Sequence, residues 1–162
     1  MNRQEKVFEL LGSLNIDYTV QTHRAVFTIE DIDKLNLSQY GHVCKNLFLR
    51  DAKGERHFLV VLCKDKKADL KMIQEQLGSS RLSFASEERL KKYLQLNKGE
   101  VSPMGIINDD GLCVEVALDK DLIGQNTLGF HPNDNTATIW ISFDALKKVI
   151  DHHGNPIHFV SV

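Results

Sequence analysis

The chain has 162 residues, of which 42% are hydrophobic and 26% charged, a composition typical of one globular domain with a substantial core. Its net charge of −2 argues against general coating of nucleic acid, because phosphate neutralisation needs a basic surface, but it leaves local contact with one RNA end open. No apolar run approaches the roughly 18 residues of a membrane span, and the charged start of the chain is unlike a signal peptide. We therefore expect a cytoplasmic protein with no membrane partner.

The first third of the chain predicts a helix, a strand and a second helix. Apolar residues at helical spacing over residues 3–14 predict an amphipathic helix. Alternation over residues 17–22 predicts a short strand, and Thr28-Ile-Glu-Asp31 is typical of a capping box that opens a short helix.

Residues 42–50 and 57–63 are the strongest strand candidates, since both are rich in Val, Leu and Phe. Asp51 to Glu55 between them predicts a turn, in which Gly54 supplies a positive φ, so the pair forms a β-hairpin. The second strand is apolar at nearly every position, which predicts a central place in the sheet with both faces covered.

The second half mixes short helices and strands. We expect a helix that ends at Gly78, helices capped by Ser86 and Ser142, and a loop over residues 97–103. Short strands are expected at residues 105–107, 112–117, 127–129, 136–141 and 157–160. This order lacks a regular βαβ alternation, so it predicts an α+β fold with a mixed β-sheet flanked by helices, as a single domain over residues 1–162.

The cysteines and the basic residues give weaker signals. Cys44, Cys63 and Cys113 match no zinc or CxxC spacing, so we expect buried, reduced thiols. Several cations could form a basic face or could be ordinary solvated side chains, namely Lys64, Lys66, Lys67, Lys71, Arg89, Lys91 and Lys92.

Lys45 is the first unusual residue. Period-two alternation places it on the same strand face as Val43, Leu47 and Leu49. A lysine on an apolar face must find acceptors, lose its proton or reach a pocket, unless it extends to solvent from an edge strand.

Two loops could also carry chemistry. Gly99-Glu-Val-Ser-Pro103 combines a glycine, which lets backbone approach a ligand, with a stiffening proline, although most such loops are only turns. His131, in Gly129-Phe-His-Pro-Asn-Asp-Asn, is either part of an Asx-rich turn or a pocket-edge histidine that fixes an amino or carbonyl group. Motifs for a serine or cysteine nucleophile, a nucleotide or HExxH zinc are missing, so we expect no metal and no cofactor.

Taken in order, four segments resemble the YbaK/prolyl-tRNA editing superfamily, and most of all its free-standing Ala-tRNA(Pro) deacylase branch (ProXp-ala/PrdX-like). The resemblance runs from the first helix to about Gly154. It rests on Lys45-Asn46-Leu-Phe-Leu-Arg-Asp, Arg81-Leu-Ser-Phe-Ala-Ser-Glu-Glu-Arg-Leu, Gly99-x-x-x-Pro103 with Gly105, Asn108 and Asp109, and Phe130-His-Pro-Asn-Asp-Asn-Thr-Ala-Thr.

The resemblance implies roles for particular residues. The superfamily's lysine falls on Lys45, which would bind the terminal adenosine or its phosphate, with Asn46 as a supporting hydrogen-bonding group. Its Gly-x-x-x-Pro loop falls on Gly99 and Pro103, where backbone groups would hold the aminoacyl carbonyl or the attacking water, and its pocket histidine falls on His131. Ser102 is a further candidate for substrate binding. Candidates for an apolar pocket wall, for which core packing is the alternative, are Val26, Phe27 and Ile29.

The resemblance also implies the activity. We expect hydrolysis of mischarged Ala-tRNA(Pro), with no covalent enzyme intermediate and with the acceptor end of tRNA(Pro) as partner. Prolyl-tRNA synthetase or an elongation factor could help delivery. The alternatives are a Cys-tRNA(Pro) deacylase of the same superfamily, since pockets discriminate weakly between side chains of similar size, and a non-catalytic, synthetase-associated tRNA-binding module.

Overall fold

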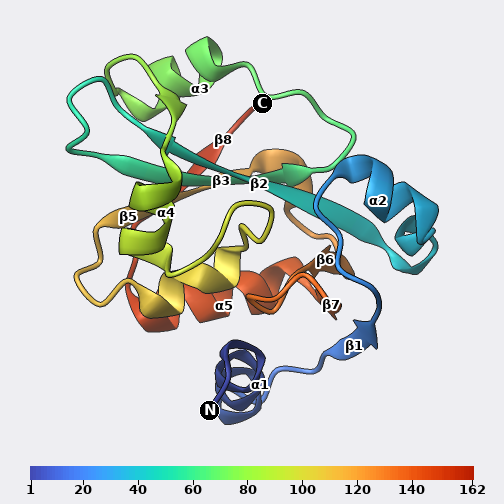
Figure 1. The fold of residues 1–162 in the computed structure, drawn as a ribbon. Helices are drawn as coiled ribbons and strands as arrows, with labels where there is room; N and C mark the ends of the chain where they lie inside the picture. The colour runs from blue at the N-terminus through green and yellow to red at the C-terminus, as the bar shows by residue number, and fades with distance from the viewer.

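The computed structural model describes residues 1–162 and centres on a mixed eight-stranded sheet (Figure 1). The strand order is β1-β7-β6-β2-β3-β5-β8, with β4 paired to β2. Pairs β2/β6, β3/β5 and β5/β8 are parallel, and the others are antiparallel. The strands are β1 (Thr19–Thr22), β2 (His42–Arg50), β3 (His57–Cys63), β4 (Ser83–Phe84), β5 (Val114–Asp119), β6 (Leu128–Phe130), β7 (Ala137–Ile141) and β8 (Ile157–Val160).

Helices cover both faces of this sheet, which confirms the predicted fold class (Figure 1). Helix α3 lies over one face, and α4 and α5 lie over the other, with α1 beyond α5. The α-helices are α1 (Arg3–Ser13), α2 (Ile29–Lys34), α3 (Leu70–Leu77), α4 (Glu87–Leu94) and α5 (Phe143–His153), and the 3₁₀ helices are η1 (Leu37–Tyr40), η2 (Pro103–Asn108) and η3 (Lys120–Leu122). Because all eight strands join into one sheet, we infer that residues 1–162 form one domain.

Three hydrophobic clusters hold the layers together. The largest has 24 buried residues from α1, α4, α5, η2 and one sheet face. A second cluster of nine packs α3 against the opposite face. A third cluster of five lies beside α2 and contains Trp140, the only tryptophan of the chain. None of the helices has the length and apolar character that crossing a lipid bilayer requires.

The predicted hairpin and helix caps are confirmed. Strand β3 lies between β2 and β5, and every residue from His57 to Leu62 is buried. Gly54 has φ +71° in the hairpin turn. Ser86 and Ser142 accept the N-cap hydrogen bonds of α4 and α5, and Gly78 ends α3 in the left-handed conformation.

One local prediction was wrong, and two others were right only in part. Residues 105–107 form part of the 3₁₀ helix η2 and not a strand, because Ser102 caps it and Pro103 occupies its first position. Thr28 caps the short helix α2 as predicted, but the hydrogen bond that Asp31 Oδ2 accepts at 3.0 Å comes from the backbone N–H of Phe27, one residue before the cap. All three cysteines are free, yet only Cys44 is buried, and the turn before β5 leaves the thiol of Cys113 exposed.

Candidate functional site

The candidate site is a cavity of about 340 Å³ beside the middle of β2. Along one edge, β2 pairs with β6 only at residues 42–43 and with β4 only at residues 49–50, so the strand between these points has a free edge. The loop before η2 and the segment that enters α2 face this gap. Of the 16 lining residues, ten are hydrophobic, and seven were predicted as site residues: Val26, Phe27, Ile29, Lys45, Asn46, Gly99 and His131.

Lys45 lines this cavity with an unpaired ammonium group. Its side chain is half-buried, and its Nζ atom has no hydrogen bond or ion pair within the chain. By contrast, Lys64 binds Asp33 and Asp65 at 2.9 Å, and Lys66 binds Asp119 at 2.6 Å. Because both lysines have acidic partners, Lys64 and Lys66 do not support the basic face that was one of the two interpretations of these residues. The cavity therefore offers a cation with free donors, which suits an anionic or carbonyl oxygen.

Asn46 offers an unpaired acceptor beside this cation. Its Nδ2 atom donates to the carbonyl oxygen of Val101 at 3.4 Å, while its Oδ1 atom is buried with no partner. In the β2/β3 pair, the backbone N–H of Lys64 donates to the carbonyl oxygen of Val43. Because hydrogen-bonding direction alternates along an antiparallel strand, the N–H and C=O of Asn46 point away from β3 and toward the gap. A buried acceptor without a hydrogen-bond partner lowers the stability of the fold, and a donor group of a bound ligand would satisfy it.

The imidazole of His131 is held in one orientation. Its Nδ1 atom lies 3.1 Å from the carbonyl oxygen of Ala137, so Nδ1 carries the proton and donates. The Nε2 atom has no partner in the chain and can accept. Burial lowers the pKa of His131, which keeps the ring neutral near pH 7. His131 thus lies in a turn and also at the edge of the cavity, so the two alternatives predicted for it hold together.

The Gly99 to Pro103 loop contributes to the cavity through its first part only. Gly99 has φ +85°, and a Cβ atom there would lie 3.0 Å from Cδ1 of Phe27. Ser102 and Pro103 do not line the cavity. Both are buried behind it, where the Oγ atom of Ser102 donates to the carbonyl oxygen of His131 at 2.5 Å. Ser102 and Pro103 thus position the loop and the histidine, and their predicted contact with substrate stays a prediction.

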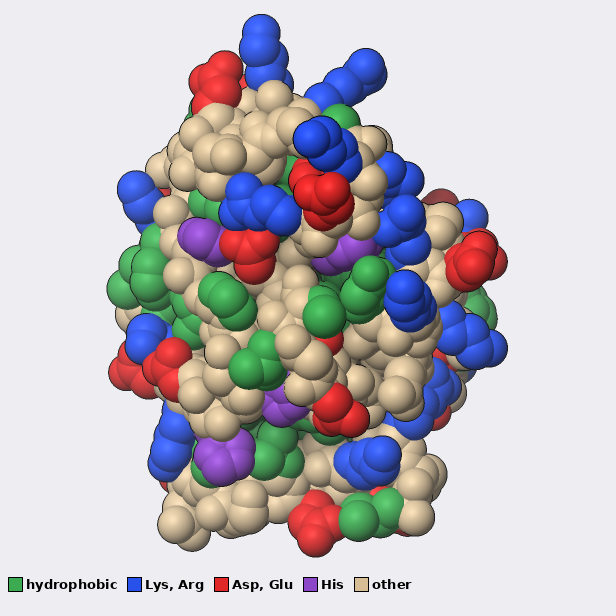
Figure 2. Space-filling model, turned by 90° about the vertical axis from the view of Figure 1, so that its left-hand side faces the viewer, with side chains coloured by type: hydrophobic (Ala, Val, Ile, Leu, Met, Phe, Trp, Pro, Cys, Tyr) green, Lys and Arg blue, Asp and Glu red, His purple; other side chains and the backbone are tan.

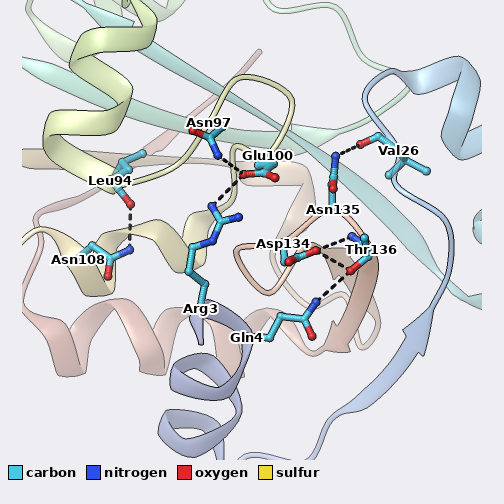
Figure 3. Close-up of polar contacts among 10 residues, drawn as sticks. All are labelled: Arg3, Gln4, Val26, Leu94, Asn97, Glu100, Asn108, Asp134, Asn135 and Thr136. Carbon is cyan, nitrogen blue, oxygen red and sulfur yellow. Dashed lines mark hydrogen bonds and ion pairs between the residues drawn. The ribbon is translucent and has the colours of Figure 1, made fainter. Parts of the chain in front are cut away.

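Helix α1 braces both loops from outside (Figure 3). Arg3 Nη1 donates to Glu100 Oε2 at 2.9 Å, and Asn97 donates to the same oxygen at 3.3 Å. Gln4 donates to Thr136 Oγ1 at 3.3 Å, in the turn that follows His131. The two loops that flank the cavity therefore share one support.

The predicted apolar wall has a buried part and an exposed part. Val26 is 1% exposed and is held by a hydrogen bond from Asn135 Nδ2 to its carbonyl oxygen (Figure 3). Phe27 is 63% exposed, and Ile29 is half-buried. Val26 therefore both packs in the core and faces the cavity, so its two predicted roles coexist.

Sequence reasoning missed several lining residues. Thr138 lines the cavity, and its Oγ1 atom lies 2.8 Å from Nε2 of His23. Cys44 also lines it, and burial raises the pKa of this thiol far above its usual range. The alternation around Lys45 placed Cys44 on the opposite strand face, and only the free edge of β2 brings both to one cavity. No group of three or more His, Cys, Asp or Glu side chains could hold a metal ion.

Comparison with known proteins agrees with this geometry. The family model of the aminoacyl-tRNA editing domain matches residues 23–149. The prolyl-tRNA editing protein ProX of Acetoanaerobium sticklandii is 48% identical over 155 residues, 96% of this chain and 94% of its own. The prolyl-tRNA synthetase associated domain-containing protein 1 of Danio rerio is 34% identical, over 95% of this chain and 85% of its own.

A solved structure shares the fold. It is described as a candidate trans-editing enzyme for prolyl tRNA synthetase and superposes with a TM-score of 0.73 at 18% identity, over 100% of this chain and 98% of its own. The resemblance to the prolyl-tRNA editing superfamily, drawn from the sequence motifs, is confirmed by these matches. The chain belongs to the family of aminoacyl-tRNA editing domains.

Proposed function

We propose that this protein hydrolyses alanine from mischarged tRNA(Pro), acting in trans as a free-standing editing deacylase. Membership of the editing family gives the class of reaction, hydrolysis of the aminoacyl-tRNA ester. The 48% identical relative named for prolyl-tRNA editing supports tRNA(Pro) as the carrier. The order of the sequence motifs supports alanine as the amino acid that is removed.

The observation that carries the proposal is the unpaired ammonium of Lys45 on the cavity wall. The substrate presents an ester, an α-amino group and a nearby phosphate. The ammonium of Lys45 binds the phosphate or ribose of the terminal nucleotide. Nε2 of His131 and Oδ1 of Asn46 are the acceptors for the α-amino group.

Hydrolysis proceeds by attack of water on the ester carbonyl. The new C–O bond forms to water, the bond to the ribose oxygen breaks, and that oxygen takes up the proton that water loses. Backbone N–H groups at the gap, including that of Asn46, stabilise the oxyanion, and one such donor is worth about 10²–10³ in rate in better-studied hydrolases. The neighbouring ribose hydroxyl activates the water, so no side-chain nucleophile is required.

Selectivity is steric in this account. The apolar wall formed by Val26, Phe27 and Ile29 admits a methyl side chain and excludes the proline ring. Cysteine is the closest competitor, because a pocket separates side chains of similar size by only about 1–3 kcal/mol. A synthetase-associated binding module without activity is the alternative from another class. Help from the synthetase or an elongation factor stays a prediction.

The test is the rate of deacylation of Ala-tRNA(Pro), Cys-tRNA(Pro) and Pro-tRNA(Pro) by catalytic amounts of the protein alone. We expect rapid loss of alanine, slow loss of cysteine and no loss of proline. Faster loss of cysteine would assign the protein to the alternative specificity. If none of the three esters is cleaved faster than in buffer, the enzyme proposal fails and the binding module takes its place.

A further inference from the structure

A second cavity of about 400 Å³ opens beside the candidate site. The two cavities share Asn46, Leu47, Gly99 and Val101, so they meet along the free edge of β2 under the loop before η2. The second cavity then runs toward β4 and the start of α4. If the aminoacyl end of a substrate occupies the first cavity, the adjoining part of that substrate can extend directly into the second.

An exposed aromatic ring stands on this second cavity. Phe84 belongs to the two-residue strand β4, is 63% exposed and forms no aromatic pair. A single exposed phenylalanine is ordinary on a protein surface. Its position is informative here, because it presents a free aromatic face above a partly apolar floor that includes Phe48 and Leu90, with one cation, Lys98, and one carboxylate, Glu87, at the same cavity.

A third, polar recess continues the path along α4. It shares Ser86 with the second cavity and is otherwise lined by Glu88, Arg89 and Lys92. Arg89 already donates to the carbonyl of Gly54 and to Nε2 of His57, whereas Lys92 makes no ion pair. On the molecular face drawn in Figure 2, Lys and Arg side chains are mixed with acidic ones and gather toward the right-hand side.

The series of the candidate cavity, an exposed aromatic ring and a recess that holds Lys92 and Arg89 beside Glu88 matches the chemistry of a single-stranded nucleic-acid end. Such strands bind by stacking bases on aromatic side chains while cations follow the phosphates. We infer that Phe84 stacks against a nucleobase of the single-stranded 3′ end of the tRNA, with Lys98 and Lys92 beside the adjoining phosphates. This inference rests on the proposed function, because the aminoacyl group must occupy the first cavity.

The test measures binding of two probes that carry no amino acid, adenosine 5′-monophosphate and the trinucleotide CCA, by NMR titration up to millimolar concentration. Phe84→Leu removes the aromatic face but keeps an apolar side chain, and Phe84→Tyr restores the face. Phe159→Leu is the matched control, because Phe159 is 40% exposed on β8, far along the sheet order from β2.

We expect Phe84→Leu to weaken CCA binding about fivefold or more, the loss that one stacked base represents, with Phe84→Tyr and Phe159→Leu close to wild type. An equal loss with adenosine 5′-monophosphate assigns the shelf to the terminal base, and a loss with CCA alone assigns it to the preceding base. Unchanged CCA binding by Phe84→Leu, or no binding by wild type, overturns the inference. An effect of Phe84→Leu on binding of prolyl-tRNA synthetase alone also overturns it and indicates a protein contact.

Because the probes carry no aminoacyl ester, binding and hydrolysis are separate readouts. Loss of CCA binding in Phe84→Leu without deacylation of any aminoacyl ester would retain the stacking contact and remove the proposed hydrolysis. Deacylation of Ala-tRNA(Pro) with no effect of Phe84→Leu on either probe would do the reverse.

Discussion

The Oγ atom of Ser102 donates to the carbonyl oxygen of His131 at 2.5 Å, which joins the two loops on either side of the candidate site. The same Oγ atom accepts the backbone N–H of Met104 at 3.1 Å, so it also caps η2. One fully buried hydroxyl therefore fixes both the 3₁₀ helix and the histidine backbone.

Replacing Ser102 by alanine should lower both stability and activity. The change leaves a buried N–H and a buried C=O without this partner, at a cost of about 1–3 kcal/mol in the free energy of unfolding. Urea unfolding measures this loss, and kcat/KM for Ala-tRNA(Pro) measures the effect on the site. Ser142→Ala is the control, since it removes a helix cap remote from the cavity for about 1 kcal/mol. Equal kcat/KM for Ser102→Ala and Ser142→Ala would show that the hydrogen bond from Ser102 to His131 does not support activity.

Gly99→Ala should impair hydrolysis more than its loss of stability explains. A non-glycine residue at φ +85° costs about 1–2 kcal/mol, and the new Cβ atom also lies 3.0 Å from the ring of Phe27. Gly124→Ala is a matched control, with φ +83° and nothing within 4 Å of its Cβ position. Steady-state kinetics should separate the two variants, whereas urea unfolding should not. Similar kinetics would mean that Gly99 serves only as a turn.

Cys44→Ala should retain hydrolysis close to the wild-type rate. Burial raises the pKa of this thiol, so almost no thiolate exists near pH 7 and Cys44 cannot serve as a nucleophile. Removing the buried sulfur should lower the free energy of unfolding by about 1 kcal/mol. Loss of activity without loss of folding, or an acyl adduct on Cys44 by mass spectrometry, would contradict hydrolysis by direct water attack.

Stability should fall as the pH drops below the ordinary histidine pKa of 6.5. Burial lowers the pKa of both His131 and His57 in the folded chain, so the unfolded chain takes up protons first as the pH falls. The stabilisation is fully present above about pH 6.5 and is lost toward the lower, folded-state pKa values. We expect the free energy of unfolding, measured with urea between pH 7 and pH 5, to fall less steeply with pH in His131→Asn than in the wild type. An unchanged slope would show that His131 is not desolvated.

Local signals in the sequence predicted most elements of the fold. Caps at Ser86 and Ser142, the stop at Gly78 and the apolar run of β3 act within a few residues, so the sequence displays them directly. Helix η2 was missed because a hydroxyl contact with the His131 carbonyl, 29 residues away, helps to fix it. The strand β4 was missed because two residues carry no periodicity.

The site was predicted residue by residue but not as an arrangement. Residue patterns identified Lys45, the Gly99 loop and His131 as candidates, and the motif resemblance added a role for Asn46. These four residues share one cavity. The brace from Arg3 to Glu100 spans 97 residues and has no sequence signature. The gap in the pairing of β2 also depends on tertiary register, so the cavity could not be located from the sequence.

Lys45→Met shows whether the free ammonium of Lys45 anchors the substrate in the cavity, because the substitution removes the charge and keeps the apolar stem of the side chain. With Ala-tRNA(Pro), we expect kcat/KM to fall about 10- to 100-fold and the salt dependence of binding to weaken by about one phosphate contact. Lys71→Met, on the exposed side of α3, should leave both unchanged. Wild-type kcat/KM and salt dependence in a folded Lys45→Met protein would show that the ammonium of Lys45 does not anchor the substrate.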